Sequence, residues 1–369
     1  MISFGLTEEQ EMIRASVRDF ATTELRGIAR RCDEASQLPD ALLDASWSLG
    51  LVAASIPERM GGGGMQRSSV TSAIVAEELA FGDAPLAAAV LAPSLFVNPL
   101  LDFGTEAQQA EYLPLFTQPR FHAATLALHE PTFGFEPARL RTVAERAGGG
   151  FRITGRKRFV PLGDRASHFL VVARGEREGL QGLEAFIMPR DARGLTIAED
   201  REKTLGLEAL PLASLELDGV EVPASARLGG ERGIDGARLI NQCRMGSAAL
   251  AVGISRAIKE FAVGYAKERE AFGGPIARKQ VIAFRLAEME IETSTMRLLV
   301  WKAASQLGQD MDATRASTLA QTYVCREAMK IADNGIQVLG GHGYMRAYPV
   351  EMWYRNTRAL TLLDGLMAL

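Results

Sequence analysis

The first third of the chain repeats an amphipathic helical pattern. From Thr7 onward, acidic residues precede an apolar stripe of Met12, Ile13, Val17 and Phe20, which is typical of a capped helix with one buried face. Similar patterns predict helices over residues 42–49, 69–81, 86–92 and 106–116, separated by glycine and proline breakers. Residues 1–120 are therefore predicted to form an N-terminal α-helical domain.

After residue 120 the pattern changes to short stretches that alternate in polarity or are rich in β-branched residues. Separated by Gly, Pro and Asp turns, these stretches cover residues 123–128, 139–145, 150–154, 157–160, 168–173, 183–188 and 214–222. Short strands at this spacing are typical of a sandwich or barrel. Residues 121–230 are therefore predicted to form a central β-barrel or β-sandwich domain.

Helical periodicity then returns in longer segments. Residues 234–269, 278–306 and 312–339 each predict a helix of 25 residues or more, and Leu250, Ile254, Ala257 and Phe261 recur on one face of the first. Helices of this length need partners along their apolar stripes. Residues 231–369 are predicted to form a C-terminal four-helix bundle, so the fold class is α+β, with a strand domain between two helical ones.

The composition is that of a soluble globular protein. The 369 residues are 47% hydrophobic and 23% charged, with a formal net charge of -4, which argues against a nucleic-acid surface. No signal peptide is recognisable, and no run reaches the roughly 18 apolar residues of a membrane-spanning helix. The three cysteines lack metal-ligand spacing, and no His pairs with a nucleophile motif. We expect a cytoplasmic protein without metal or hydrolase chemistry.

Two glycine-containing turns are candidate ligand sites. Residues 269–280, REAFGGPIARKQ, combine Arg269 with a Gly pair, and a guanidinium with accessible backbone amides suits a pyrophosphate. A helical hairpin turn with a solvated Arg is the alternative. In residues 334–365, a predicted helix ends in Gly340 and Gly341, which either opens the backbone to a ligand or only caps the helix.

Taken together, these features resemble the acyl-CoA dehydrogenase superfamily of flavoproteins over the whole chain. The motifs are RxxFGxPIxxxQ at 269–280 and QxxGGxGY at 337–344. In addition, HEPTFG at 129–134 is similar to the family's TEPGAGSD, GRKRFV at 155–160 is similar to GTKxWIT, and LDGVEVPASARLGG at 217–230 is similar to the usual exit from the strand domain.

The resemblance implies FAD bound at a subunit interface and an acyl-CoA substrate. A carboxylate would remove the thioester α-proton, a hydride would pass from Cβ to flavin N5, and an electron-transfer flavoprotein would accept the electrons. The residues that match the family's FAD-contacting positions are Arg269, Phe272, Gln280, Gln337, Gly340, Gly341 and Phe159. Those that match substrate-side positions are Arg244, Phe135 and Gly365.

Asp364 matches the position of the catalytic base, which is usually the glutamate of YEGT. A base for a weakly acidic α-proton must lie within hydrogen-bond reach in a dry pocket that raises its pKa. Asp is one methylene shorter than Glu, and a misplacement of about 1 Å can reduce the rate on the order of 100-fold. Other members carry the base just before the bundle-helix Arg, where this chain has Cys243, so Asp364 is the carboxylate that matches either position.

Further departures surround the flavin and thioester positions. Phe159 replaces a Trp, and Pro161 has neither a side-chain hydroxyl nor an N–H to offer the ring. Leu366 replaces a Thr that approaches FAD, and the family's terminal helix is not expected after Leu369. In the TEPGAGSD counterpart, the substituted residues are His129, Phe135 and Glu136, and we expect Phe135 to narrow the pocket.

Several functional hypotheses follow. The first is a homotetrameric FAD-dependent acyl-CoA dehydrogenase. The second is a flavin-poor subunit of a hetero-oligomeric enzyme of the sterol side-chain type, which lends its intact half-site to a second acyl-CoA dehydrogenase subunit. The third is an oxidase of the same superfamily, since members with an Asp base include a nitroalkane-oxidising enzyme. A non-enzymatic scaffold that keeps only the fold is the last.

Overall fold

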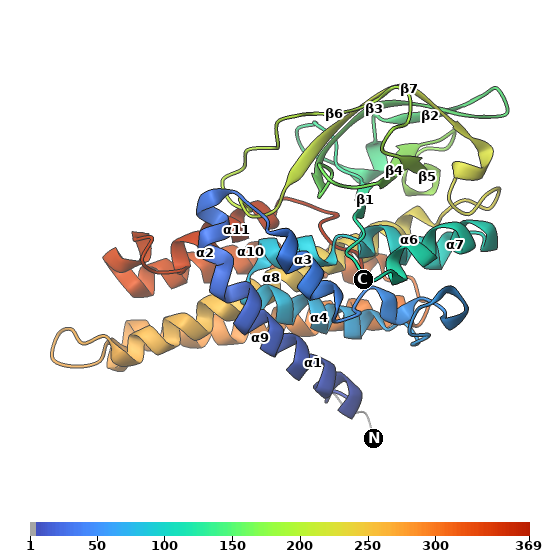
Figure 1. Ribbon diagram of the computed structural model, residues 1–369. Helices are drawn as coiled ribbons and strands as arrows, with labels where there is room; N and C mark the ends of the chain where they lie inside the picture. Colours follow the sequence, from blue (N-terminus) through green and yellow to red (C-terminus); the bar gives the residue numbers. More distant parts are fainter. Residues whose placement is uncertain (1–4) are drawn as a thin grey trace.

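The computed structural model describes residues 5–369, in which short N-terminal helices precede a sheet and then long helices (Figure 1). At the start of the first helix, the Thr7 hydroxyl accepts a hydrogen bond from the Gln10 backbone while the Gln10 side chain accepts one from the Thr7 N–H. The N-terminal helices are α1 (Glu8–Phe20), α2 (Arg26–Ala35), α3 (Asp40–Trp47), α4 (Ser69–Gly82), α5 (Ala84–Leu91), α6 (Ser94–Phe103) and α7 (Glu106–Tyr112).

Helix α6 was not among the predicted helices. Pro93 and Pro99 suggest breaks in the sequence, but Pro93 is the N-cap and Pro99 lies inside the helix. The helix forms here because buried residues on every side of α6 pack against the sheet and α8, so tertiary packing outweighs the proline signal.

Within residues 5–369 the strands form one seven-stranded sheet of order β1-β4-β2-β3-β7-β6, with β5 paired to β4. The strands are β1 (Ala124–Ala127), β2 (Val143–Ala147), β3 (Gly150–Pro161), β4 (His168–Arg174), β5 (Leu183–Pro189), β6 (Leu195–Ile197) and β7 (Leu212–Pro223). The two stretches predicted at 150–154 and 157–160 are a single strand, β3, whose register against β7 shifts twice. The predicted strand at 139–145 begins only at Val143, after a 3-10 turn at Pro137–Arg139.

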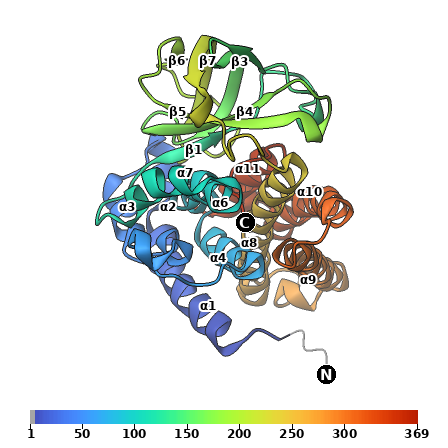
Figure 2. The same cartoon turned by 90° about the vertical axis from the view of Figure 1, so that its right-hand side faces the viewer.

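The long C-terminal helices lie beneath the sheet, with α8 near the centre of the helical layer (Figure 2). They are α8 (Gly236–Glu268), α9 (Gln280–Gly308) and α10 (Thr314–Leu339), followed by the shorter α11 (Val350–Leu360). Helix α4 approaches α8 closely at Gly253, where an added Cβ would lie 2.3 Å from the Glu77 carbonyl oxygen. One apolar core therefore runs through the N-terminal and C-terminal helices, and the predicted α+β fold class is confirmed.

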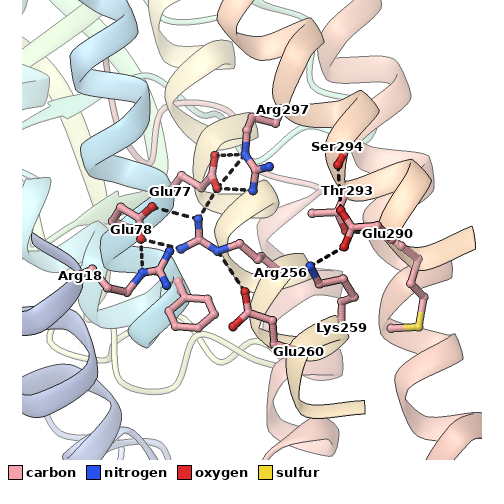
Figure 3. Close-up of polar contacts among 12 residues, drawn as sticks. Arg18, Glu77, Glu78, Arg256, Lys259, Glu260, Glu290, Thr293, Ser294 and Arg297 are labelled. Atoms are coloured by element: carbon pink, nitrogen blue, oxygen red, sulfur yellow. Dashed lines mark hydrogen bonds and ion pairs between the residues drawn. The ribbon is translucent and has the colours of Figure 1, made fainter. Parts of the chain in front are cut away.

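A buried ion cluster crosses this helical core (Figure 3). The Arg256 guanidinium of α8 donates to Glu77 at 2.5 Å and to Glu78 at 2.6 and 2.9 Å, both on α4. Arg297 of α9 also donates to Glu77, at 2.7 Å, and Arg18 of α1 donates to Glu78. Burial alone would raise the pKa of Glu78, but the hydrogen bonds from Arg256 and Arg18 lower it. The cluster therefore fixes α1, α4, α8 and α9 relative to one another.

In the described part of the chain, no single helix is long and apolar enough to cross a membrane. Helices α5 and α6, which are bent by 43° relative to each other, have the length and apolar composition of a membrane span only when taken together.

Candidate active site

Asp364 lies in a tight turn that directs the chain from α11 into the protein interior. Gly365 has a φ of +76°, a conformation that favours glycine, and an added Cβ there would lie 3.3 Å from the Leu128 side chain. The Asp364 side chain is only 13% exposed. A carboxylate is thus brought into apolar surroundings next to the sheet.

Two side chains from different helices face this carboxylate. The Gln321 amide of α10 donates to Oδ1, and Arg244 Nε of α8 lies 3.7 Å from Oδ2, a distance of an ion pair and not of a hydrogen bond. Burial raises the pKa of Asp364 above its usual value, and this effect outweighs the opposing effects of Arg244 and Gln321. A carboxyl of this kind is a stronger proton acceptor than an exposed Asp.

The backbone of the same turn is held by His129. The Asp364 N–H donates to His129 Nε2 at 2.8 Å, so the imidazole carries its proton on Nδ1. Burial lowers the pKa of His129 to about 4, which keeps the ring neutral near pH 7. Phe135 stacks on this imidazole with ring centroids 4.1 Å apart, and Phe159 meets it edge-on at 6.1 Å.

The segment that carries His129 is anchored by a buried ion pair. Lys157 Nζ lies 3.1 Å from Glu130 Oε1 and donates to the Leu128 carbonyl at 3.0 Å. The Glu130 carboxylate also accepts from the backbone N–H groups of Arg141 and Thr142 at 2.7 and 2.8 Å. Because each polar atom of the pair has a partner, the loop from β1 is rigid and the His129 ring is fixed.

Phe159 lies where β3 loses register against β7, between Lys157 and Val160. Its φ of +54° is unusual for a bulky residue. At this bulge the Phe159 ring is half-buried and packs against the helical core. Strained backbone of this kind concentrates at functional sites.

A second group of predicted residues lies at the far end of α8. A cavity of about 520 Å³ is lined by Arg269, Phe272, Gln337, Gly340 and Gly341, whereas Gln280 is exposed and is not among the lining residues. The Phe272 side chain is 90% exposed. The structure therefore gathers both glycine-containing turns around one cavity.

This cavity fits a phosphate-bearing ligand. An added Cβ at Gly340 or Gly341 would have no heavy atom within 4 Å, so the backbone is open on that side. Arg269 supplies charge, and His342, held by Tyr265 at 2.8 Å, forms part of the wall. A guanidinium beside accessible backbone is the arrangement that binds phosphate groups.

The two groups of residues are well separated within the chain. Arg244 and Arg269 are 25 positions apart along α8 and its C-cap, which corresponds to roughly 37 Å at about 1.5 Å per residue. Figure 1 likewise places the turn after α8 far from the C-terminus, which lies among the helices. Asp364, Arg244, Gly365, Phe135 and Phe159 thus belong to one region, and Arg269, Phe272, Gln337, Gly340 and Gly341 to another.

Sequence reasoning missed Gln321 as a partner of Asp364. It is one polar residue among many on α10, and no motif distinguishes it. In residues 5–369, no group of three or more His, Cys, Asp and Glu side chains is arranged to hold a metal ion. Arg244 Nε is a buried donor that lacks a hydrogen-bond partner in the described residues, which leaves it available to a ligand beside Asp364.

Comparison with known proteins assigns the whole chain to one family. Residues 7–118, 125–220 and 235–367 match the N-terminal, middle and C-terminal domains of acyl-CoA dehydrogenases. The short-chain specific acyl-CoA dehydrogenase of Bos taurus mitochondria is 32% identical over 98% of this chain and 88% of its own length.

Two solved structures are similar throughout. Butyryl-CoA dehydrogenase from Megasphaera elsdenii superposes with a TM-score of 0.89 at 29% identity, covering 99% of this chain and 96% of that one. A glutaryl-CoA dehydrogenase from Mycobacterium smegmatis in complex with FADH2 gives a TM-score of 0.86 at 28% identity, covering 98% and 92%. With these matches and the buried carboxylate site, the chain belongs to the acyl-CoA dehydrogenase family.

Proposed function

We propose that this protein catalyses the FAD-dependent α,β-dehydrogenation of an acyl-CoA thioester, with Asp364 as the base. The observation that carries this proposal is the buried carboxylate of Asp364, whose pKa is raised by burial while Gln321 and Arg244 still face it. A base of this kind accepts a proton from a weakly acidic C–H group near neutral pH.

In the proposed reaction, Asp364 takes the α-proton of the thioester. When bound, FAD supplies the acceptor for the hydride that leaves Cβ. The Gln321 amide orients the carboxylate through Oδ1, which leaves Oδ2 and its neighbour Arg244 directed at the substrate. His129 holds the turn through the Asp364 N–H, and the apolar surroundings exclude water, which would otherwise stabilise the charged base.

For the cofactor, Phe159 would face the flavin ring, while Arg269, Phe272, Gln337, Gly340 and Gly341 would contact the phosphate-bearing part. Since these two groups are separated along α8, we propose that each FAD is shared between two copies of the chain. Gln280 would contribute through its position at the start of α9, next to the lining residues Lys279 and Val281.

An exposed apolar stripe on α9 supports a homo-oligomer. Phe284, Ile291 and Leu298 are 61%, 61% and 54% exposed, and their spacing of seven residues puts them on one side of the helix. Exposed apolar side chains arranged in this way mark an interaction surface. An electron-transfer flavoprotein as electron acceptor is proposed from family resemblance.

A second candidate function is that of a flavin-poor partner subunit in a mixed oligomer. The stacked rings of Phe135 and His129 favour it, because they occupy the region beside Asp364 that a flavin and thioester must enter. The cavity around Arg269 would still serve the FAD of the other subunit.

One experiment separates these candidates. The visible absorption spectrum of the purified protein gives the flavin-to-protein ratio, and anaerobic addition of a panel of acyl-CoAs reports flavin reduction. A ratio near one flavin per chain with bleaching by a thioester supports the dehydrogenase. Little flavin, together with a second chain in native mass spectrometry of the complex from its own cell, supports the partner subunit. A flavin-loaded protein that no thioester reduces would refute both candidates, since flavin loading contradicts the flavin-poor subunit and absence of reduction contradicts the dehydrogenase.

A further inference from the structure

The chain continues past Asp364 into the protein interior instead of returning to the surface. Leu366, Met367, Ala368 and Leu369 are 0%, 2%, 0% and 0% exposed. Figures 1 and 2 both show the C-terminus among the helices, near α6 and α8. We call residues 366–369 the inner segment.

The inner segment is held by polar contacts as well as by packing. Asn98 Nδ2 of α6 donates to the Ala368 carbonyl at 2.9 Å, and the Leu369 N–H donates to the Gln242 carbonyl of α8 at 3.3 Å. On α8, Gly246 allows a close approach, since an added Cβ would lie 2.4 Å from the Met367 carbonyl oxygen. The surrounding helices are thus shaped to receive this segment.

The inner segment lies between the carboxylate and a large cavity. Asp364 is two residues before it. Met367 forms part of the wall of a cavity of about 710 Å³, which is also lined by α1, α4, α6, the end of α9 and the loops at residues 49–55 and 65–68. Ser94 and Asn98, which contact the Ala368 carbonyl, line the same cavity. Residues 365–367 thus connect the Asp364 turn directly to the wall of this cavity.

We propose that the inner segment sets the acyl-chain length that the site accepts, with Met367 as its main specificity-determining residue. This inference rests on the proposed function. A short acyl group binds beside the segment, whereas a longer one requires the space that the Met367 side chain fills.

The test is Met367→Ala, with Leu362→Ala as the control because Leu362 is 65% exposed and precedes Asp364 by two residues. The kcat/KM of each protein is measured over straight-chain thioesters from butyryl-CoA to dodecanoyl-CoA. Each buried methylene changes affinity about fourfold, so the ratio of octanoyl-CoA to butyryl-CoA activity should rise at least about tenfold in Met367→Ala. Leu362→Ala should keep the parent's ratio.

Binding is measured separately by calorimetry in an Asp364→Asn background, in which the thioester is not consumed. Octanoyl-CoA should bind more tightly when Met367→Ala is added. Unchanged chain-length profiles and unchanged binding in a folded, flavin-loaded Met367→Ala protein would overturn the inference. Should that variant fail to fold, Met367→Val removes less volume and tests the same point. If no thioester reduces the parent's flavin, the proposed function fails, while the calorimetric comparison still decides the role of the segment.

Discussion

Replacing Asp364 with Asn removes the proposed base without removing its shape. A positioned general base contributes about 10²- to 10⁴-fold to a proton transfer, and the buried site admits little water that could substitute for it. We therefore expect the rate of flavin reduction by a saturating acyl-CoA to fall by at least about 100-fold. FAD content should remain that of the parent, because Asn keeps the size and shape of the Asp364 side chain and the cavity around Arg269 is unchanged.

The same substitution should not destabilise the fold. Charges 3.7 Å apart attract by about 4 kcal/mol at an effective dielectric constant of about 20. The pKa of Asp364 is nevertheless raised, so burial outweighs this attraction. A raised folded-state pKa means that the carboxyl favours folding at low pH and that this contribution is lost as pH rises through the folded-state pKa. At neutral pH, Asp364→Asn should unfold at an equal or higher urea concentration than the parent.

Stopped-flow absorbance of the flavin under anaerobic conditions measures the rate. Since the base acts when deprotonated, the parent's rate should rise with pH. Gln321→Leu removes a donor to the charged carboxylate and should move that rise to higher pH, whereas a substitution with a purely structural effect would lower the rate at every pH alike. Flavin reduction at the parent's rate in Asp364→Asn would refute the assignment of this residue as base.

Three further predictions concern other parts of the molecule. Arg269→Ala should weaken FAD binding by about 1.5 to 3 kcal/mol, measured as flavin retained after dialysis; Arg278→Ala, a nearby exposed control, should retain the parent's content. Asp83→Asn should stabilise the protein above pH 7 by up to about 4 kcal/mol, because burial raises the pKa of Asp83 to about 7 and its contribution to stability is lost as pH rises through that value. Arg256→Met should lower the free energy of unfolding by about 3 to 5 kcal/mol in urea titrations, since it leaves two buried glutamates with fewer partners; an unchanged midpoint for either stability variant would contradict the corresponding argument.

The long amphipathic helices could be predicted from sequence because their apolar stripes persist over many turns. The ranges expected at 234–269 and 312–339 differ from α8 and α10 by only a few residues. The three-residue strand β6 is too short for periodicity to identify it, and helix α11 was not predicted within residues 334–365, where the glycine turn is the more prominent feature. The two strands expected at 150–154 and 157–160 are one strand, β3, with a bulge at Phe159. This bulge depends on the positive φ of Phe159, which no residue pattern predicts.

The residues of the candidate site could be predicted only where they lie in a sequence motif of the family. Asp364 and the glycine-containing turns follow from family resemblance. The contacts of Gln321 and His129 with the Asp364 turn join residues more than 40 positions apart. Such contacts are set by how helices and sheet pack, which single-residue propensities do not encode. The stacking of Phe135 on His129 is likewise not predictable from the sequence, and the narrowing of the pocket by Phe135 stays a prediction.

The length of α8 has a genetic consequence. If each FAD is shared as proposed, Asp364 and Arg269 of one chain belong to two different composite sites. An Asp364→Asn chain paired with an Arg269→Ala chain, each impaired alone, would form one intact site and one doubly defective site. Co-expression of the two variant chains should therefore give more activity than either variant has alone. Two variants that both alter the Asp364 region, or both alter the cavity around Arg269, should not complement each other.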